Sequence, residues 1–392
     1  MTTTVQTTED ILAHLVSFDT TSRDSNLALL DWIEAWLAQF GVYGERVYNE
    51  TGSKANFYAT IGPQDLGGYV LSGHTDTVPV AGQDWHTNPF QLVAKGDRLH
   101  GRGTTDMKGF IACVLGRVPA MTAAPLQTPL HLAFSYDEEV GCQGVPKLLA
   151  ELAHRPVRPL GCFVGEPTEM AIVVAHKAKQ SFRVKFRGLA CHSSQAPLGV
   201  NAILYAARFV HFMEALNQRL ANSVSAPLYD IPVSTAHVGV IQGGTAINIV
   251  PQDCVVELEF RVLPTEDIEA IVAEMYAEVA ALDAEMQARH ADCAAHIEAI
   301  SAFPGLHTSP QADIVQLAKM LRQTQTITKV AFGTEAGLFT QQLGVPTVVV
   351  GPGSIDQAHK PNEYVQVDQL RACEAFIDAL VTHCQQPRSA GL

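Results

Sequence analysis

The side chains best able to hold a metal ion or move a proton lie in five short segments of this sequence. Each segment combines histidine, aspartate or glutamate with glycine, and four of them follow apolar runs that are typical of β-strands. The segments are residues 72–79, 101–109, 136–141, 165–168 and 351–363. Open α/β sheets bind ligands outside the carboxyl ends of their strands, so we expect the segments to converge at one edge of a sheet.

Each segment taken alone is ambiguous. The chain has 15 histidines, most of which we expect at the surface or in structural roles. Residues 101–109 resemble a phosphate-binding loop, but the G-x-G-x-x-G pattern needs glycine at the position of Asp106. The acidic triplet at residues 137–139 is usually a solvated turn, although three carboxylates at a strand end are costly unless water or cations neutralise them.

The combination of segments is more specific, because side chains able to bind a metal ion would meet at one edge of the sheet. Asp76 stands two residues after His74, so it can accept one imidazole N–H and leave the other nitrogen for a metal. Asp106 is a candidate oxygen ligand. Two metal ions can lower the pKa of a shared water and polarise an amide carbonyl, while a nearby carboxylate carries the proton to the leaving amine.

The composition describes a globular protein with more than one domain. The chain has 392 residues, of which 47% are hydrophobic and 17% charged. A net charge of −14 argues against nucleic acid and anionic membranes as partners, because both select basic patches. No apolar run is long enough to span a bilayer, residues 1–10 lack a secretory apolar core, and the eight scattered cysteines suit a reducing compartment. We therefore expect a cytoplasmic protein.

The hydrophobic pattern predicts an α/β domain interrupted by a second domain. Short strands alternate with helices in the first 176 residues, which is typical of a sheet covered on both faces. From residue 181 to residue 300 the order becomes strand–helix–strand–strand–helix–strand, the split ferredoxin-like pattern. We predict a discontinuous catalytic domain of residues 1–176 and 303–392, and an inserted ferredoxin-like α+β domain of residues 177–302.

The same segments resemble those of the M20 family of metallopeptidases, in the family's order and over nearly the whole chain. The resemblance lies in Gly73-His74-Thr75-Asp76, Asp106-Met107-Lys108-Gly109, Asp137-Glu138-Glu139-Val140-Gly141, Gly165-Glu166-Pro167-Thr168 and His359. Residues 333–337 and 351–361 are most similar to the members that deacetylate N-acetyl-L-ornithine. The resemblance implies a mixed-sheet, zinc-peptidase-like catalytic domain. It also implies that the inserted domain acts as a lid and pairs two chains in a homodimer.

The resemblance implies a centre of two divalent metal ions. Zn²⁺ suits a mixture of imidazole and carboxylate ligands, with Co²⁺ or Mn²⁺ as replacements. Asp106 would bridge the two ions. His74 and Glu166 would complete one ion, and Glu139 and His359 the other.

Two further carboxylates of the acidic segments receive roles from the resemblance. Asp76 would orient His74, and Glu138 would be the general base that takes a proton from the bridging water. The alternative is that Glu138 and Glu139 are both ligands or both solvated.

The resemblance also nominates residues that bind the substrate. His192 would donate to the tetrahedral oxyanion, in its own active site or in that of the partner subunit. Arg261, with Asn248 beside it, would bind the substrate carboxylate, because arginine offers a planar pair of donors. A salt bridge at the strand end is the alternative for Arg261. Glu335 would face the pocket and favour a cationic side chain such as that of ornithine.

The sequence therefore predicts a metal-dependent hydrolase of small N-acyl amino acids. The leading expectation is hydrolysis of N-acetyl-L-ornithine to L-ornithine and acetate, within arginine biosynthesis. The alternatives are a succinyl-diaminopimelate desuccinylase, an aminoacylase of other specificity, and a relative that binds but no longer turns over its ligand. A nucleotide-binding α/β protein is disfavoured, because no G-x-G-x-x-G or Walker A loop occurs.

Overall fold

A computed structural model describes residues 6–387 and divides the chain into two compact units. The first unit runs up to Ala175 and includes Leu306–Lys329 and the chain from Thr334 onward. The second unit consists of His176–Gly305 and Val330–Gly333. Among residues 6–387, no helix combines the length and the apolar character that a membrane span requires.

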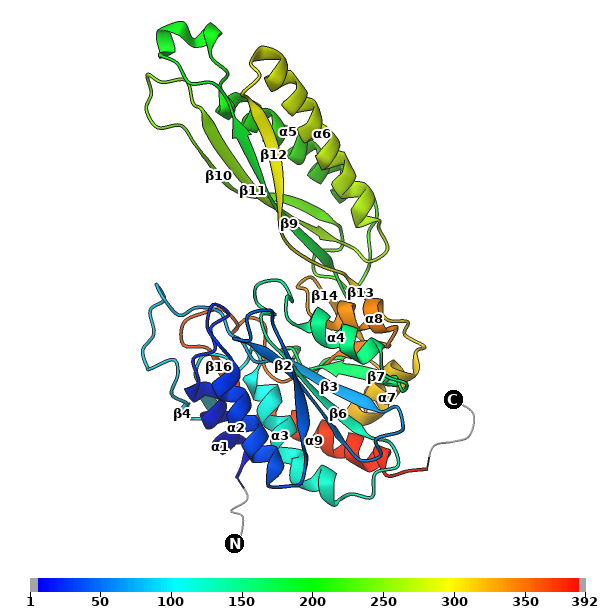
Figure 1. Cartoon of the computed structure of the whole chain (residues 1–392). Helices are drawn as coiled ribbons and strands as arrows, with labels where there is room; N and C mark the ends of the chain where they lie inside the picture. Colours follow the sequence, from blue (N-terminus) through cyan, green and yellow to red (C-terminus); the bar gives the residue numbers. More distant parts are fainter. Residues whose placement is uncertain (1–5, 388–392) are drawn as a thin grey trace. The chain divides into compact units, whose positions relative to one another are not determined.

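A mixed sheet forms the centre of the first unit (Figure 1). Within the described residues it has nine strands, in the order β1-β2-β6-β3-β7-β15-β8-β13, with β14 paired to β8. Their bounds are β1 (Gly44–Tyr48), β2 (Ala55–Ile61), β3 (Tyr69–His74), β6 (Leu130–Ser135), β7 (Gly161–Val164), β8 (Val173–His176), β13 (Leu306–His307), β14 (Thr328–Val330) and β15 (Thr347–Val349). Because β3 runs parallel to both β6 and β7 while β1, β2 and β8 pair antiparallel, the expected mixed α/β fold is confirmed.

Helices cover both faces of this sheet, which explains why its central strands are buried. Every residue of β6 and β7 is buried, as expected for strands packed on both sides. Figure 1 shows α4 and α8 on the opposite side of the sheet from α1, α2, α3 and α9, and α7 packs against α9. The helices are α1 (Thr8–Ser17), α2 (Leu27–Ala38), α3 (Lys108–Ala123), α4 (Val145–Ala153), α7 (Asp313–Arg322), α8 (Ala336–Leu343) and α9 (Val367–Cys384).

A small antiparallel sheet joins two polar loops of the first unit that are distant in sequence. It has the order β16-β5-β4, formed by β16 (Tyr364–Gln366), β5 (Arg98–His100) and β4 (Val93–Lys95). Tyr364 pairs with His100, so the loop that begins at residue 101 lies beside the loop that ends at residue 363. Two of the five polar segments therefore meet at this small sheet.

The second unit consists of an antiparallel sheet packed against two helices. The sheet order is β10-β11-β9-β12, with β9 (Ala178–Arg187), β10 (Thr235–Gly243), β11 (Asp253–Val262) and β12 (Ala294–Phe303). The helices α5 (Ala202–Ala221) and α6 (Ile268–Arg289) are capped by Asn201 and Asp267, whose side chains accept hydrogen bonds from main-chain N–H groups of the first turn. Alternation along β11 buries Val256, Leu258 and Phe260 against these helices.

Candidate metal centre

The central parallel strands deliver histidine and glutamate side chains to one edge of the sheet. His74 is the last residue of β3, the Glu138–Glu139 pair follows β6, and Glu166 follows β7 by two residues. Since β6, β3 and β7 are adjacent and parallel, their carboxyl ends lie together. The loops joined by the small sheet supply Asp106 and His359, so all five nominated metal ligands belong to the first unit.

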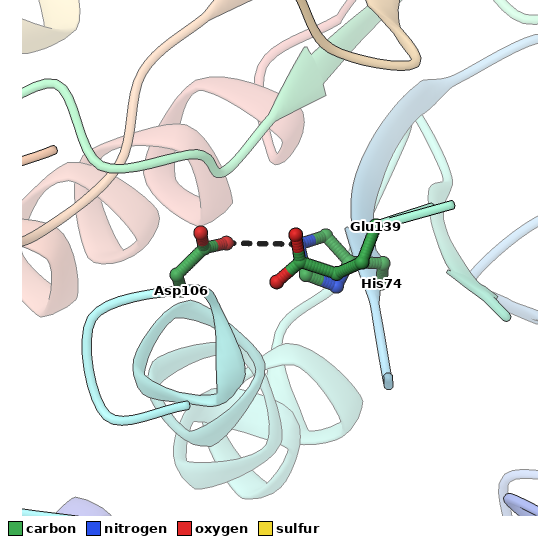
Figure 2. A group of neighbouring side chains, drawn as sticks. All are labelled: His74, Asp106 and Glu139. Atoms are coloured by element: carbon green, nitrogen blue, oxygen red, sulfur yellow. Dashed lines mark hydrogen bonds and ion pairs between the residues drawn. The ribbon is translucent and has the colours of Figure 1, made fainter. Parts of the chain in front are cut away.

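The two carboxylate oxygens of Asp106 face two different histidines. Its Oδ1 lies 3.0 Å from Nε2 of His74, and its Oδ2 lies 3.1 Å from Nε2 of His359. Nε2 of His359 is also 2.9 Å from Oε2 of Glu139, and Nε2 of His74 is 3.6 Å from Oε1 of Glu166. Figure 2 shows Asp106 and Glu139 directed toward His74. Asp106 therefore stands between two groups of potential ligands.

These residues fit divalent metal ions. The ligand atoms of His74, Asp106 and Glu139 all lie within 4.8 Å of one another, as do those of His74, Glu138 and Glu166. Ligands about 2.0–2.2 Å from a zinc ion have separations of roughly 3–4 Å. One oxygen each of Glu139 and Glu166 is buried without a hydrogen-bond partner, which a bound cation would satisfy. Glu138 also lies close enough to His74 and Glu166 to share a metal ion with them, and the metal content of a Glu138→Gln variant distinguishes a ligand from a base.

Electrostatics of the centre also favour added positive charge. Burial and the neighbouring Asp106 raise the pKa of Glu139 to about 7, and burial with the nearby Glu139 and Asp106 raises the pKa of Glu138 to about 8. Hydrogen bonds with Asp106 and Glu139 raise the pKa of His359 to about 10. Burial alone would raise the pKa of Asp106, but hydrogen bonds from His359 and His74 outweigh it and lower the pKa. The cluster is therefore short of cations, and metal ions would relieve the repulsion.

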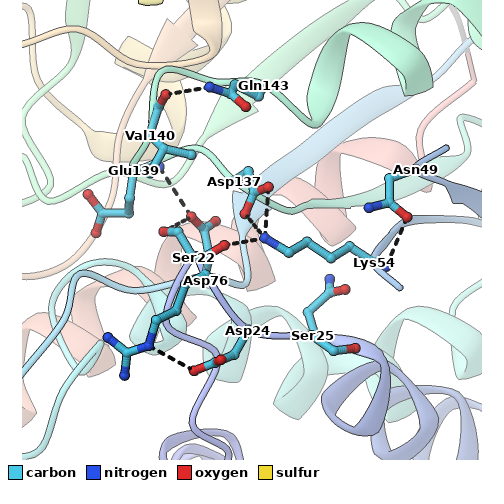
Figure 3. Close-up of polar contacts among 12 residues, drawn as sticks. Ser22, Asp24, Ser25, Asn49, Lys54, Asp76, Asp137, Glu139, Val140 and Gln143 are labelled. Carbon is cyan, nitrogen blue, oxygen red and sulfur yellow. Dashed lines mark hydrogen bonds and ion pairs between the residues drawn. The ribbon is translucent and has the colours of Figure 1, made fainter. Parts of the chain in front are cut away.

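Asp76 contacts more of the site than the sequence predicted. His74 Nδ1 hydrogen-bonds with the main-chain oxygen of Asp76 at 3.0 Å, whereas the Asp76 carboxylate is 3.5 Å from that nitrogen. The carboxylate accepts the main-chain N–H groups of Glu138 and Glu139 at 3.1 and 3.2 Å, and the hydroxyl of Ser22 at 2.8 Å (Figure 3). Asp76 thus contacts both His74 and the acidic turn.

Glu335 is buried beside the carboxyl ends of two central strands. It is 1% exposed, and its carboxylate accepts the hydroxyls of Ser72 at 2.6 Å and Ser135 at 2.7 Å. Both serines lie near the carboxyl ends of β3 and β6. Each oxygen of Glu335 therefore already accepts one hydrogen bond from the sheet.

The second unit holds the remaining nominated residues. His192 is exposed, and its Nδ1 lies 2.8 Å from the hydroxyl of Ser194. An isolated bridge joins His192 to Ile249, and the main-chain N–H of Ser193 donates to the main-chain oxygen of Asn248 at 2.9 Å, so His192 and Asn248 lie on neighbouring segments. Arg261 is 28% exposed and its Nε contacts Glu259 at 3.0 Å, which is the strand-end salt bridge considered as its alternative role.

Two buried charged residues that were not predicted from the sequence, Arg102 and Glu363, support the loop that carries Asp106. The carboxylate of Glu363 accepts the N–H groups of Gly103, Thr105 and Asp106 at 3.0, 2.9 and 3.1 Å, and the guanidinium of Arg102 at 2.8 Å. Arg102 and Glu363 are each 1% exposed. Their types gave a signal, since charged residues are rarely buried unless paired, but their burial was not readable from sequence.

The clustered ligands fit a metal-dependent enzyme, and comparison with known proteins identifies the class as a metal-dependent amide hydrolase. Residues 70–383 match peptidase family M20/M25/M40, and the chain belongs to this family. Acetylornithine deacetylase of Myxococcus xanthus is 34% identical over 95% of this chain and 96% of its own length. Acetylornithine deacetylase of Pasteurella multocida (strain Pm70) is 31% identical over 93% of each.

Solved structures share the fold at lower sequence identity. An M20 family metallo-carboxypeptidase from Sulfolobus solfataricus superposes with a TM-score of 0.79 at 17% identity, covering 95% of this chain and 98% of that one. A dinuclear metal-binding M20 peptidase from Bacillus subtilis has a TM-score of 0.66 at 15% identity, covering 96% and 97%. The expected family and the expected class of enzyme are confirmed.

Proposed function

We propose that this protein hydrolyses N-acetyl-L-ornithine to L-ornithine and acetate, in the cytoplasm and within arginine biosynthesis. The proposal of metal-dependent hydrolysis rests on the position of Asp106, whose two oxygens lie 3.0 and 3.1 Å from Nε2 of His74 and of His359. This arrangement suits a carboxylate shared by two ions. The ornithine part rests on the similarity to acetylornithine deacetylases over more than nine-tenths of the chain.

In this proposal, His74 and Glu166 would hold one divalent ion, Glu139 and His359 would hold the other, and Asp106 would contribute to both. Zn²⁺ suits these nitrogen and oxygen donors best. When bound, the two ions supply a water of lowered pKa and a polarised carbonyl.

Glu138 is then the proton carrier of the reaction. Its main-chain N–H is held by Asp76 at 3.1 Å, and its Oε1 lies 3.3 Å from the thiol of Cys142, so both ends of the residue are fixed within the first unit. A carboxyl group held in this way can accept the proton of the attacking water and return it to the leaving amine.

The second unit serves as lid and dimerisation domain in this proposal. His192 donates to the oxyanion, and Asn248 and Arg261 bind the substrate carboxylate. The strand β10 lies at an edge of its sheet and carries the exposed apolar side chains Val240 and Ile241. Exposed edge strands favour pairing with another chain, which supports a homodimer.

The test is a panel of N-acyl amino acids assayed with zinc-reconstituted protein. We expect a higher kcat/KM for N-acetyl-L-ornithine than for N-succinyl-diaminopimelate or N-acetyl-leucine. Equal or reversed preference would refute the substrate and leave the family membership intact. Arg261→Ala should raise KM across the panel. The matched control is Arg183→Ala, because Arg183 also pairs with a strand glutamate, Glu257, at 2.6 Å but has no assigned substrate role.

A further inference from the structure

Lys54 immediately precedes β2, and its backbone is fixed by Asn49. The side-chain oxygen of Asn49 accepts the N–H groups of Ser53 at 2.9 Å and Lys54 at 3.1 Å. The main-chain oxygen of Lys54 accepts the N–H of Asn49 at 2.9 Å. This closed turn determines where the lysine side chain begins, and Figure 3 shows the side chain extending from it toward Asp137.

The ammonium group of Lys54 binds the residue that precedes the proposed base. Its Nζ lies 2.6 and 2.9 Å from the two oxygens of Asp137, and it also donates to the main-chain oxygen of Ser22. The lysine and aspartate side chains are only 12% and 14% exposed. Water screens such a pair less than an exposed one, so its geometry is held more firmly than that of an ordinary surface salt bridge.

Asp137 adopts a left-handed backbone conformation at the start of the acidic turn. Its φ is +55°, a left-handed conformation that residues with a Cβ rarely adopt. Conformations of this kind persist only where surrounding contacts impose them, and they are common at functional sites. The left-handed turn at Asp137 sets the direction in which the chain continues into Glu138.

The contacts form a closed ring around the acidic turn. Ser22 receives a hydrogen bond from Lys54 at its main-chain oxygen and donates its hydroxyl to Asp76. Asp76 in turn accepts the N–H groups of Glu138 and Glu139. Lys54 therefore holds the turn through the Asp137 side chain, and Asp76 holds it through the main chain, with Ser22 joining the two (Figure 3).

We propose that Lys54 is a positioning residue, whose ion pair with Asp137 fixes the turn that aims Glu138 at the metal centre. This inference rests on the role given to Glu138 in the proposed function. Loss of the ammonium group would leave Asp137 unpaired and its left-handed backbone less constrained. A displacement of about 1 Å of a reacting group can cost on the order of 10²-fold in rate.

The test compares three variants with the wild-type protein, all loaded with zinc. Lys54→Met removes the charge but keeps the length of the side chain, and Lys54→Arg keeps the charge. The control is Lys147→Met, because Lys147 pairs with Glu50 at 3.4 Å on the surface of the same unit, with the two side chains 39% and 90% exposed. Metal content, melting temperature, kcat and KM are measured for each.

We expect Lys54→Met to retain both ions and to lower kcat about 10- to 100-fold, with KM changed less than about twofold. Lys54→Arg should recover most of the loss, and Lys147→Met should match the wild type. A role that acts through Glu138 also predicts non-additivity. In a Glu138→Gln background, Lys54→Met should lower kcat further by less than about threefold.

Two results would overturn the inference. One is a wild-type kcat in Lys54→Met. The other is a loss in the Glu138→Gln background as large as in the wild type, because a general structural support would act in both. The Glu138→Gln variant alone tests the proposed function, since its full activity would remove the proposed base. A large loss in Glu138→Gln together with unchanged Lys54→Met overturns the positioning role only.

Discussion

Replacing Glu363 with glutamine should loosen the loop that carries Asp106, although Glu363 is not a metal ligand in our proposal. The Glu363 carboxylate accepts four donors, three of them main-chain N–H groups of the loop around Asp106 and the fourth the guanidinium of Arg102. Burial raises the pKa of Glu363. Because all four partners are donors, the ionised carboxylate is nevertheless the form that accepts from all of them.

The magnitude follows from the burial of this ion pair. Removing one partner of a buried pair typically costs about 3–5 kcal/mol, because the other charge stays buried and unpaired. Arg102 retains contacts with the ring of Trp85 at 5.0 Å and with Gln83, and glutamine keeps one acceptor oxygen. These contacts favour the lower limit, about 3 kcal/mol. For a large domain this corresponds to a fall in melting temperature of roughly 6–12 °C.

The assay is thermal unfolding of protein from which metal has been removed with a chelator, so that altered metal binding does not contribute to the shift in melting temperature. Glu50→Gln is the matched control, because Glu50 is 90% exposed in its pair with Lys147 and should contribute at most about 1 kcal/mol. In separate samples reconstituted with zinc, metal content should be lower in Glu363→Gln than in the control. Equal melting temperatures for the two variants would refute the claim that Glu363 supports the Asp106 loop.

Three further predictions concern the centre and the second unit. Glu138→Gln should keep both ions and lose a factor on the order of 10²–10⁴ in kcat, whereas Glu139→Gln should lose metal and recover partly with added Zn²⁺; the opposite pattern of metal content would reverse the two roles. Burial raises the pKa values of Glu138 and Glu139 to about 8 and about 7, and carboxylate contacts raise that of His359 to about 10. Raised pKa values of the two glutamates and of the histidine all make the folded state less stable as pH rises. The melting temperature of metal-free protein should therefore fall between about pH 5 and about pH 9, and saturating zinc should reduce this fall. A melting temperature that rises with pH would contradict this prediction. Mixing His192→Ala chains with Glu138→Gln chains should restore some activity if His192 acts across a dimer, and fully active monomers at assay concentration would argue against the dimer.

The convergence of the polar segments could be predicted from the sequence because it follows from strand direction alone. His74, Glu139 and Glu166 come after apolar runs, and parallel neighbours bring their carboxyl ends together. This prediction did not require knowing which strands pair with each other or how far apart the side chains lie. The mixed α/β fold likewise follows from the alternation of strands and helices.

Short strands and long-range ion pairs were beyond reach of the sequence pattern. Both β5 and β16 have three residues, too few to show a period, yet their pairing brings the Asp106 loop to the His359 loop. Lys54 and Asp137 are 83 residues apart, so nothing local marks them as partners. The burial of Glu335 depends in the same way on hydroxyls from two separate strands.

The central claim is that two metal ions share Asp106. Its most direct test is to measure the metal content and the amide-hydrolysing activity of the same reconstituted protein. We predict two divalent ions per chain at saturation, loss of activity on chelation and recovery when Zn²⁺ is restored. Asp106→Asn should impair both sites, because one oxygen of Asp106 faces each histidine. One ion or none at saturation, with amide hydrolysis intact, would contradict the account.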